Sequence, residues 1–184
     1  GNEWKKIMRV EELVYNNPGT FYQLLRFIFN HGSQMKRIEL PTPLPEDLTL
    51  LDIVEDPRKI ESEINPGVMV RPVDVDRALE ALNYPTKPEG TVVLSVNDPL
   101  IESNCGIYSL EFFSESPTCE VKRIDESTMA DVSIDVGTLS QIYTGHLTPR
   151  QAIALGRMNL KDRDKLELLN SVFPAHKTIS SDGF

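Results

Sequence analysis

The spacing of hydrophobic residues changes twice between residues 130 and 160, and each change predicts a different element. Apolar residues in 132–136 alternate with polar ones, which is typical of a strand with one buried face. The apolar residues of 139–143 follow helical spacing instead, and Gly145 is expected to end that helix. The pattern therefore predicts a strand that leads directly into a short helix.

A second short helix is predicted immediately afterwards by its end signals. In the run Thr148-Pro149-Arg150-Gln151, the threonine is expected as N-cap, the proline at the first helical position and the glutamine as capping-box partner. Gly156 is expected to end this helix before a last extended turn. None of these residues is a catalytic group, so the whole segment indicates a scaffold.

The rest of the chain after residue 65 follows patterns that complete a domain. Residues 69–73 are expected to be extended, and Asp74 to cap a helix. The apolar positions of that helix share one face and are Val75, Ala78, Leu79 and Leu82. Three strands are predicted at 91–97, 107–113 and 119–124, and a last helix from about Asp162 to Pro174. Strands followed by helices predict an α+β domain with a mostly antiparallel sheet covered by helices on one face.

Residues 1–64 hold too few elements to form a domain by themselves. One helix is predicted, with an apolar face made by Phe21, Leu24, Leu25 and Ile28. One strand is predicted at 36–40, and three prolines at 41–45 stop regular structure after it. Because these elements cannot bury a core alone, we expect 1–64 to be the end of a domain and 65–184 to be a second, self-sufficient domain.

Composition narrows the class of partner. The chain has 184 residues and a formal net charge of −9, which disfavours binding to nucleic acid or to an anionic membrane and favours cationic partners. No signal peptide or long apolar run is present, so a cytoplasmic location is expected. Cys105 and Cys119 are expected to be free thiols, with pairing across neighbouring strands as the alternative. Since the chain begins with Gly1, we expect it to be a piece of a longer protein.

The sequence holds little recognisable chemistry. It has no glycine-rich phosphate loop, so no cofactor-binding residues are expected. The histidines at 31, 146 and 176 and the thiol of Cys105 follow no metal-ligand or catalytic spacing, so no metal is expected. Asp131 and Asp135 lie on one strand face as a conceivable carboxylate pair, but simple alternation with a solvated face already explains them.

One candidate group is the α-carboxylate of Phe184, the last residue of the sequence. A polar tail that ends in an aromatic residue suggests a ring held in an apolar pocket and a carboxylate held at a defined place. Removal of water from that carboxylate would raise its pKa toward that of a useful general base. The alternative is a disordered end with a chance phenylalanine.

Four segments together resemble a known family. They read PGTFYQLLRFIFNHGSQMKRIEL, PGVMVRPVDVDRALEAL, GTVVLSVNDPL and DVSIDVGTLSQIYTGHLTPRQAIALGRM. They are similar to the Eis-type (enhanced intracellular survival) N-acetyltransferases of the GNAT superfamily. The resemblance implies that 1–64 is the C-terminal part of the central GNAT-like domain and that 65–184 is a C-terminal domain resembling sterol carrier protein.

The resemblance also implies a function. Family members acetylate amines, including aminoglycosides and lysine-type amines, and form homo-oligomers, commonly hexamers. Their acetyl-CoA is bound by an N-terminal GNAT domain, which this sequence does not include, so this chain alone is expected to be inactive. Their C-terminal carboxylate is the general base, a role that would fall to Phe184 here. Gly183 stands where some members carry an acid, so a substrate contact from that position is not expected.

Two other functions remain open at this stage. The domain could bind a lipid or other hydrophobic ligand, as a sterol-carrier-like fold suggests. The residues that would line such a tunnel are Val92, Leu94, Val96, Leu110, Phe112 and Leu155, and a plain core explains them equally well. The domain could also serve only to hold an oligomer together.

Overall fold

The structure is a computed structural model that describes residues 6–40, 50–61, 63, 69–84 and 86–176. It divides into two compact units, Gly1–Ile64 and Asn65–Phe184. The first unit contains helix α1 (Pro18–Asn30), the short helix α2 (Leu50–Ile53) and a two-stranded parallel sheet. The strands of that sheet are β1 (Ile7–Arg9) and β2 (Arg37–Glu39), and 3₁₀ turns lie at Gly32–Gln34 and Pro57–Lys59.

Helix α1 forms as its apolar spacing predicts, with Phe21, Leu25 and Ile28 buried. It begins earlier than expected, because the side chain of Asn17 accepts a hydrogen bond from the N–H of Thr20 at 2.9 Å and the helix tolerates Pro18 at its first position. Strand β1 was not predicted, since three residues are too few to show an alternation.

The second unit is built on a five-stranded sheet with the order β5-β4-β3-β6-β7. Its strands are β3 (Gly90–Asn97), β4 (Gly106–Phe112), β5 (Cys119–Ile124), β6 (Val132–Asp135) and β7 (Met158–Leu160). All neighbouring pairs are antiparallel except β3 and β6, which are parallel. A 3₁₀ turn at Glu102–Asn104 lies between β3 and β4.

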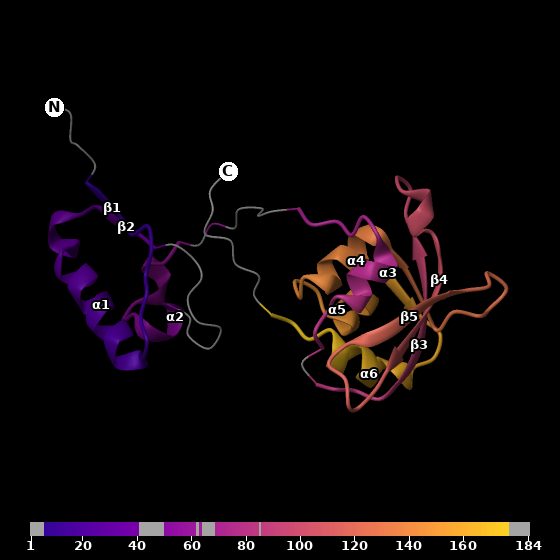
Figure 1. Cartoon of the computed structure of the whole chain (residues 1–184). Coiled ribbons are helices and arrows are strands. Elements are labelled where there is room, and N and C mark those ends of the chain that lie inside the picture. Colours follow the sequence, from indigo (N-terminus) through magenta and orange to yellow (C-terminus); the bar gives the residue numbers. More distant parts are fainter. Residues whose placement is uncertain (1–5, 41–49, 62, 64–68, 85, 177–184) are drawn as a thin grey trace. The chain divides into compact units, whose positions relative to one another are not determined.

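Helices gather on one side of this sheet, as Figure 1 shows. They are α3 (Val75–Glu80), α4 (Val136–Tyr143), α5 (Pro149–Ala154) and α6 (Lys165–Val172). Alternate residues of the strands face them and form the core, among them Val92, Leu94 and Leu110. The predicted fold class, a mostly antiparallel sheet covered by helices, is confirmed.

The end signals of the helices are largely those that the sequence predicts. The hydroxyl of Thr148 accepts a hydrogen bond from the N–H of Gln151, and the Gln151 side chain accepts one from the N–H of Thr148, so the predicted capping box is present. Val136 begins α4 instead of ending the strand, because Asp135 caps that helix. Helix α3 ends at Glu80, so Leu82 packs on the core from outside it.

Helix α6 begins at Lys165, later than the expected start near Asp162. Among the helices in the described ranges, none has the length and the apolar character that crossing a membrane requires.

Candidate functional site

The predicted site residue, Phe184, lies outside the described residues. The structure does describe the approach to it, because the chain can be followed from α6 to His176. Val172 and Phe173 are buried in the core, and the N–H of His176 donates a hydrogen bond to the carbonyl oxygen of Gly145 at 3.0 Å. The C-terminal segment therefore leaves the domain beside the turn that joins α4 to α5.

Gly145 is required in that turn for two reasons. Its φ is +72°, in the left-handed region that glycine adopts without strain. In addition, the imidazole of His176 covers its α-carbon: a Cβ at this position would lie 2.6 Å from ring atom Cγ and closer still to two other ring atoms. Any other residue would displace the histidine. The sequence signal for Gly145 was that of a helix end alone, and it did not reveal this contact.

A second fixed point holds the beginning of the domain. Asp98 is fully buried at the end of β3 and forms an ion pair with Arg71, whose side chain is 34% exposed. The same carboxylate accepts hydrogen bonds from the N–H groups of Leu100 (2.9 Å) and Ile101 (3.1 Å) and from the side-chain amide of Asn104 (2.9 Å). This network joins the segment before α3 to the β3–β4 connection.

The network also sets the charge state of Asp98. Burial would raise the pKa of this carboxyl, but the Asn104 amide, the backbone N–H groups of Leu100 and Ile101 and the charge of Arg71 outweigh it and lower the pKa to about 2. Asn104 in turn donates to the carbonyl oxygen of Pro72 at 3.2 Å. The carboxylate is therefore a structural anion whose oxygens are already occupied.

Asp131 and Asp135 form no acid–base pair, and the interpretation of both as a solvated face is also incomplete. Asp131 accepts a hydrogen bond from the N–H of Val93 at 2.9 Å and so holds the residue before β6 against β3. Asp135 accepts from the N–H of Thr138 at 2.9 Å and from its hydroxyl at 2.6 Å. Partial burial raises the pKa of Asp135, but the Thr138 donors outweigh it and leave the pKa below its usual value.

The two cysteines are free, as predicted, and each has a structural contact. The thiol of Cys105 lies 3.2 Å from both the backbone nitrogen and the carbonyl oxygen of Asp98. The thiol of Cys119 is buried, 3.4 Å from the hydroxyl of Tyr84. Burial raises the pKa of the Cys119 thiol, which keeps it protonated and poorly nucleophilic.

The three histidines each have a different local environment. His31 contacts the carbonyl oxygen of Phe27 at 2.9 Å, His146 is exposed, and His176 lies over Gly145. In the described part of the chain, no three His, Cys, Asp or Glu side chains are placed to hold a metal ion.

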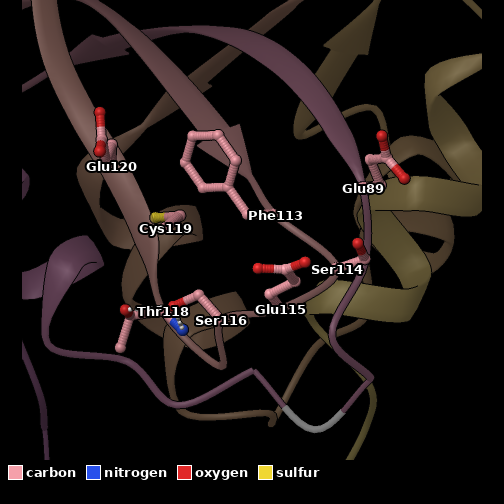
Figure 2. Close-up of a pocket in the computed structure, with 8 residues that line it drawn as sticks. All are labelled: Glu89, Phe113, Ser114, Glu115, Ser116, Thr118, Cys119 and Glu120. Carbon is pink, nitrogen blue, oxygen red and sulfur yellow. Dashed lines mark hydrogen bonds between the residues drawn. The ribbon is translucent and has the colours of Figure 1, made fainter.

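A surface hollow of about 480 Å³ lies at the turn between β4 and β5. Figure 2 shows Phe113 and the carboxylates of Glu89, Glu115 and Glu120 around it. Glu120 is paired with Lys122 at 3.2 Å. The sequence pattern predicts the two strands that flank this stretch but not the hollow, because Glu89 comes from the segment before β3. Three carboxylates thus line this hollow, one of them paired with a lysine.

Among the described residues, the cavity between the sheet and the helices is too small for a ligand. A cavity of about 20 Å³ lies among ten side chains that include Leu94, Leu139 and Phe173. That volume is about the size of one water molecule, far below what an acyl chain needs. Of the residues expected to line a tunnel, Leu155 is 63% exposed and lines no interior space, while the other five are packed in the core.

The backbone donors at the start of α1 are already occupied. There Pro18 has no N–H, and the N–H groups of Thr20 and Phe21 are bound by Asn17. A phosphate group would find these donors occupied.

Comparisons with known proteins divide the chain in the same order. A family model described as "Sterol carrier protein domain" matches residues 75–181, and one described as "Acetyltransferase (GNAT) domain" matches residues 2–72. A comparison with curated proteins gives no significant match.

Solved structures extend the similarity over the whole chain. Eis1 from Mycobacterium abscessus is 25% identical with a TM-score of 0.71, over 100% of this chain and 44% of that one. A GCN5-related N-acetyltransferase from Anabaena variabilis is 23% identical with a TM-score of 0.70, over 92% of this chain and 42% of that one. One from Kribbella flavida is 20% identical with a TM-score of 0.64, over 96% and 43%.

The chain thus spans less than half the length of each of these structures. At 23% and 20% identity, the structures from Anabaena variabilis and Kribbella flavida support the fold alone. Together with the two family models, the similarity to Eis1 confirms the resemblance to Eis-type acetyltransferases that the sequence motifs predict.

Proposed function

The chain belongs to the sterol carrier protein domain family, and we propose that it is the C-terminal portion of an Eis-like, acetyl-CoA-dependent amine N-acetyltransferase. The observation that carries this proposal is the similarity to Eis1, which extends over the entire chain at 25% identity. A GNAT segment followed by a sterol carrier protein domain supports it further. In this proposal, an N-terminal GNAT domain of the same protein binds acetyl-CoA, and acetyl-CoA supplies the acetyl group.

The contribution of this chain is a proton acceptor. An aliphatic amine is mostly protonated near neutral pH and must lose a proton before its nitrogen can attack a carbonyl carbon. We assign that proton to the α-carboxylate of Phe184. The acceptors are cationic amines of the aminoglycoside or lysine type, and the net charge of −9 favours their approach.

Removal of the terminal carboxylate tests this role. In the longer protein, deletion of Phe184 is expected to lower kcat/KM for acetyl transfer to an amine by about 10²- to 10⁴-fold, the usual contribution of a general base. Replacement of the Phe184 carboxylate by a carboxamide, through peptide ligation, should have the same effect because it keeps the ring and removes the proton acceptor. The chain 1–184 alone is expected to transfer no acetyl group.

A matched control separates the carboxylate from the ring. Phe184→Leu keeps the carboxylate at the same position, so it should retain most of the activity that the carboxamide loses. An active parent protein whose kcat/KM is unchanged by the deletion would refute the role of Phe184. A parent protein that acetylates no amine would refute the proposed function as a whole.

We also propose that the parent protein is a homo-oligomer, as its resemblance to the Eis family implies. The mass of the chain in solution, compared with 20.8 kDa for the monomer, measures how much of that assembly depends on residues 1–184.

A further inference from the structure

We propose that Gly145 and His176 form an anchor that sets the point from which the C-terminal segment leaves the domain, and that both are positioning residues for the Phe184 carboxylate. This inference rests on the proposed function, because it adds a device that serves the same general base. It assigns a role to a contact between the α4–α5 turn and the end of the chain, which are 31 residues apart in sequence.

The contact consists of a hydrogen bond and a close packing of the ring. The N–H of His176 donates to the carbonyl oxygen of Gly145 at 3.0 Å, and the imidazole lies over the α-carbon of the same glycine. The ring nitrogen Nδ1 also lies 3.2 Å from the carbonyl oxygen of Pro174. Gly145 is buried although it belongs to a surface turn, because His176 covers it.

The turn that accepts this contact is itself held firmly. The N–H of Gly145 donates to the carbonyl oxygen of Ile142 at 3.0 Å, and the N–H of Leu147 donates to that of Gln141 at 3.1 Å. The capping box of Thr148 comes directly after it. The acceptor at Gly145 is therefore part of the rigid domain, and a residue bound to it shares that rigidity.

The anchor shortens the part of the chain that separates the domain from the carboxylate. Without it, the last residue fixed by the core would be Phe173, and eleven residues would remain; with it, eight residues remain, 177–184. Eight residues span at most about 26–29 Å. The shorter length alone raises the local concentration of the carboxylate only about 1.6-fold. The larger effect is a fixed origin at His176, since a misplacement of about 1 Å at a reacting group can cost up to about 10²-fold in rate.

The chain offers a matched control for a test by substitution. Gly156 also ends a helix with a positive φ, +68°, but a Cβ there would meet nothing within 4 Å. Gly145→Ala and Gly156→Ala therefore introduce the same backbone strain, and Gly145→Ala alone also displaces the imidazole. In the longer protein, we expect Gly145→Ala to lower kcat about tenfold with the KM for acetyl-CoA unchanged, and Gly156→Ala to change kcat less than about twofold.

Two further variants keep the test informative if Gly145→Ala folds poorly. His176→Pro removes the N–H donor without touching the turn and should lower kcat to a similar extent. Gly145→Ala combined with His176→Ala removes the colliding ring, so the backbone hydrogen bond can form again and kcat should recover. Amide hydrogen exchange gives a readout besides activity: protection of the His176 N–H should be lost in Gly145→Ala and retained in Gly156→Ala.

Combination with the deletion of Phe184 distinguishes the two proposals. If the anchor acts through the tail, Gly145→Ala should lower kcat no further once Phe184 is absent. If deletion of Phe184 is harmful while Gly145→Ala and Gly156→Ala behave alike, the general base stands and the anchor is refuted. An additional loss from Gly145→Ala in the deleted protein also refutes the anchor. If deletion of Phe184 leaves kcat/KM unchanged, the role of Phe184 as general base is refuted, and the positioning role of Gly145 and His176 is refuted with it.

Discussion

The two units of this chain bury their apolar residues to very different extents. In the second unit, the apolar side chains of five strands and four helices meet in one core. In the first unit, α1 buries Phe21, Leu25 and Ile28, yet it leaves Phe27 63%, Tyr22 49% and Phe29 45% exposed. Because these aromatic side chains stay partly exposed among the described residues, α1 buries less of its apolar surface than the core of the second unit, so we infer that the second unit carries most of the stability of the chain.

The largest expected difference between the units comes from the same substitution in each core. Leu110 and Leu25 are both buried, at 1% and 2% exposure. Leu110→Ala should lower the free energy of unfolding by about 3 kcal/mol, because it opens a cavity in the common core. Leu25→Ala should change the free energy of the main unfolding transition by less than about 0.5 kcal/mol relative to the unsubstituted chain.

Chemical denaturation followed by circular dichroism measures both variants. Equal losses of unfolding free energy in Leu110→Ala and Leu25→Ala would mean that the two units unfold as one. This result would contradict the inference that the second unit carries most of the stability.

A second difference concerns ion pairs and pH. The buried Asp98 has a pKa lowered to about 2, below that of an unfolded chain, so its charge stabilises the fold fully above about pH 4 and progressively less as pH falls toward 2. Asp98→Asn should reduce stability at pH 7 and flatten the dependence of stability on pH between 4 and 2.

The first unit supplies the control for this prediction. Glu39 is paired with Arg9 at 3.0 Å and with Arg37, and these donors also lower its pKa, but the pair lies at the surface where water screens it. Glu39→Gln should therefore change the pH dependence of unfolding much less than Asp98→Asn. A parallel series of denaturation curves from pH 7 to pH 2 decides between them, and equal flattening would contradict the structural role of Asp98.

The smallest expected difference is between two helix caps. Thr148 caps α5 and Asn17 caps α1, each through a side-chain oxygen that accepts a backbone hydrogen bond. Thr148→Ala should lower the free energy of unfolding by about 1 kcal/mol. Asn17→Ala should have no measurable effect on the main transition if the first unit contributes little to it. Thermal unfolding of both variants tests this, and a larger loss in Asn17→Ala would reverse the comparison.

The sequence predicts elements well where a residue's neighbours in the chain determine its state. The strand at 119–124 and the capping box at Thr148 are both observed as predicted, because each signal is complete within a few residues. The prediction that Val136 ends the strand was wrong, because this residue begins helix α4. An apolar residue after Asp135 fits the end of a strand as well as the start of a helix.

The candidate site was much harder to predict from the sequence. The network of Asp98 with Arg71 and Asn104 depends on three segments that meet only in the fold. The contact of His176 with Gly145 likewise joins distant residues, and glycine gave no sign of it beyond the end of a helix. Neither arrangement produces a periodic pattern, so only the tertiary structure reveals it.

The parallel pairing of β3 with β6 has a consequence for the order of folding. Leu94 pairs with Val132, so the central contact of the sheet closes a loop of nearly forty residues, whereas β3, β4 and β5 follow one another as antiparallel neighbours. Because distant pairings are entropically slower to form, we expect the three-stranded meander to assemble first. During synthesis, β3 then presents an open edge until β6 emerges from the ribosome. During that interval we expect the unpaired edge of β3 to be open to pairing with strands of other chains.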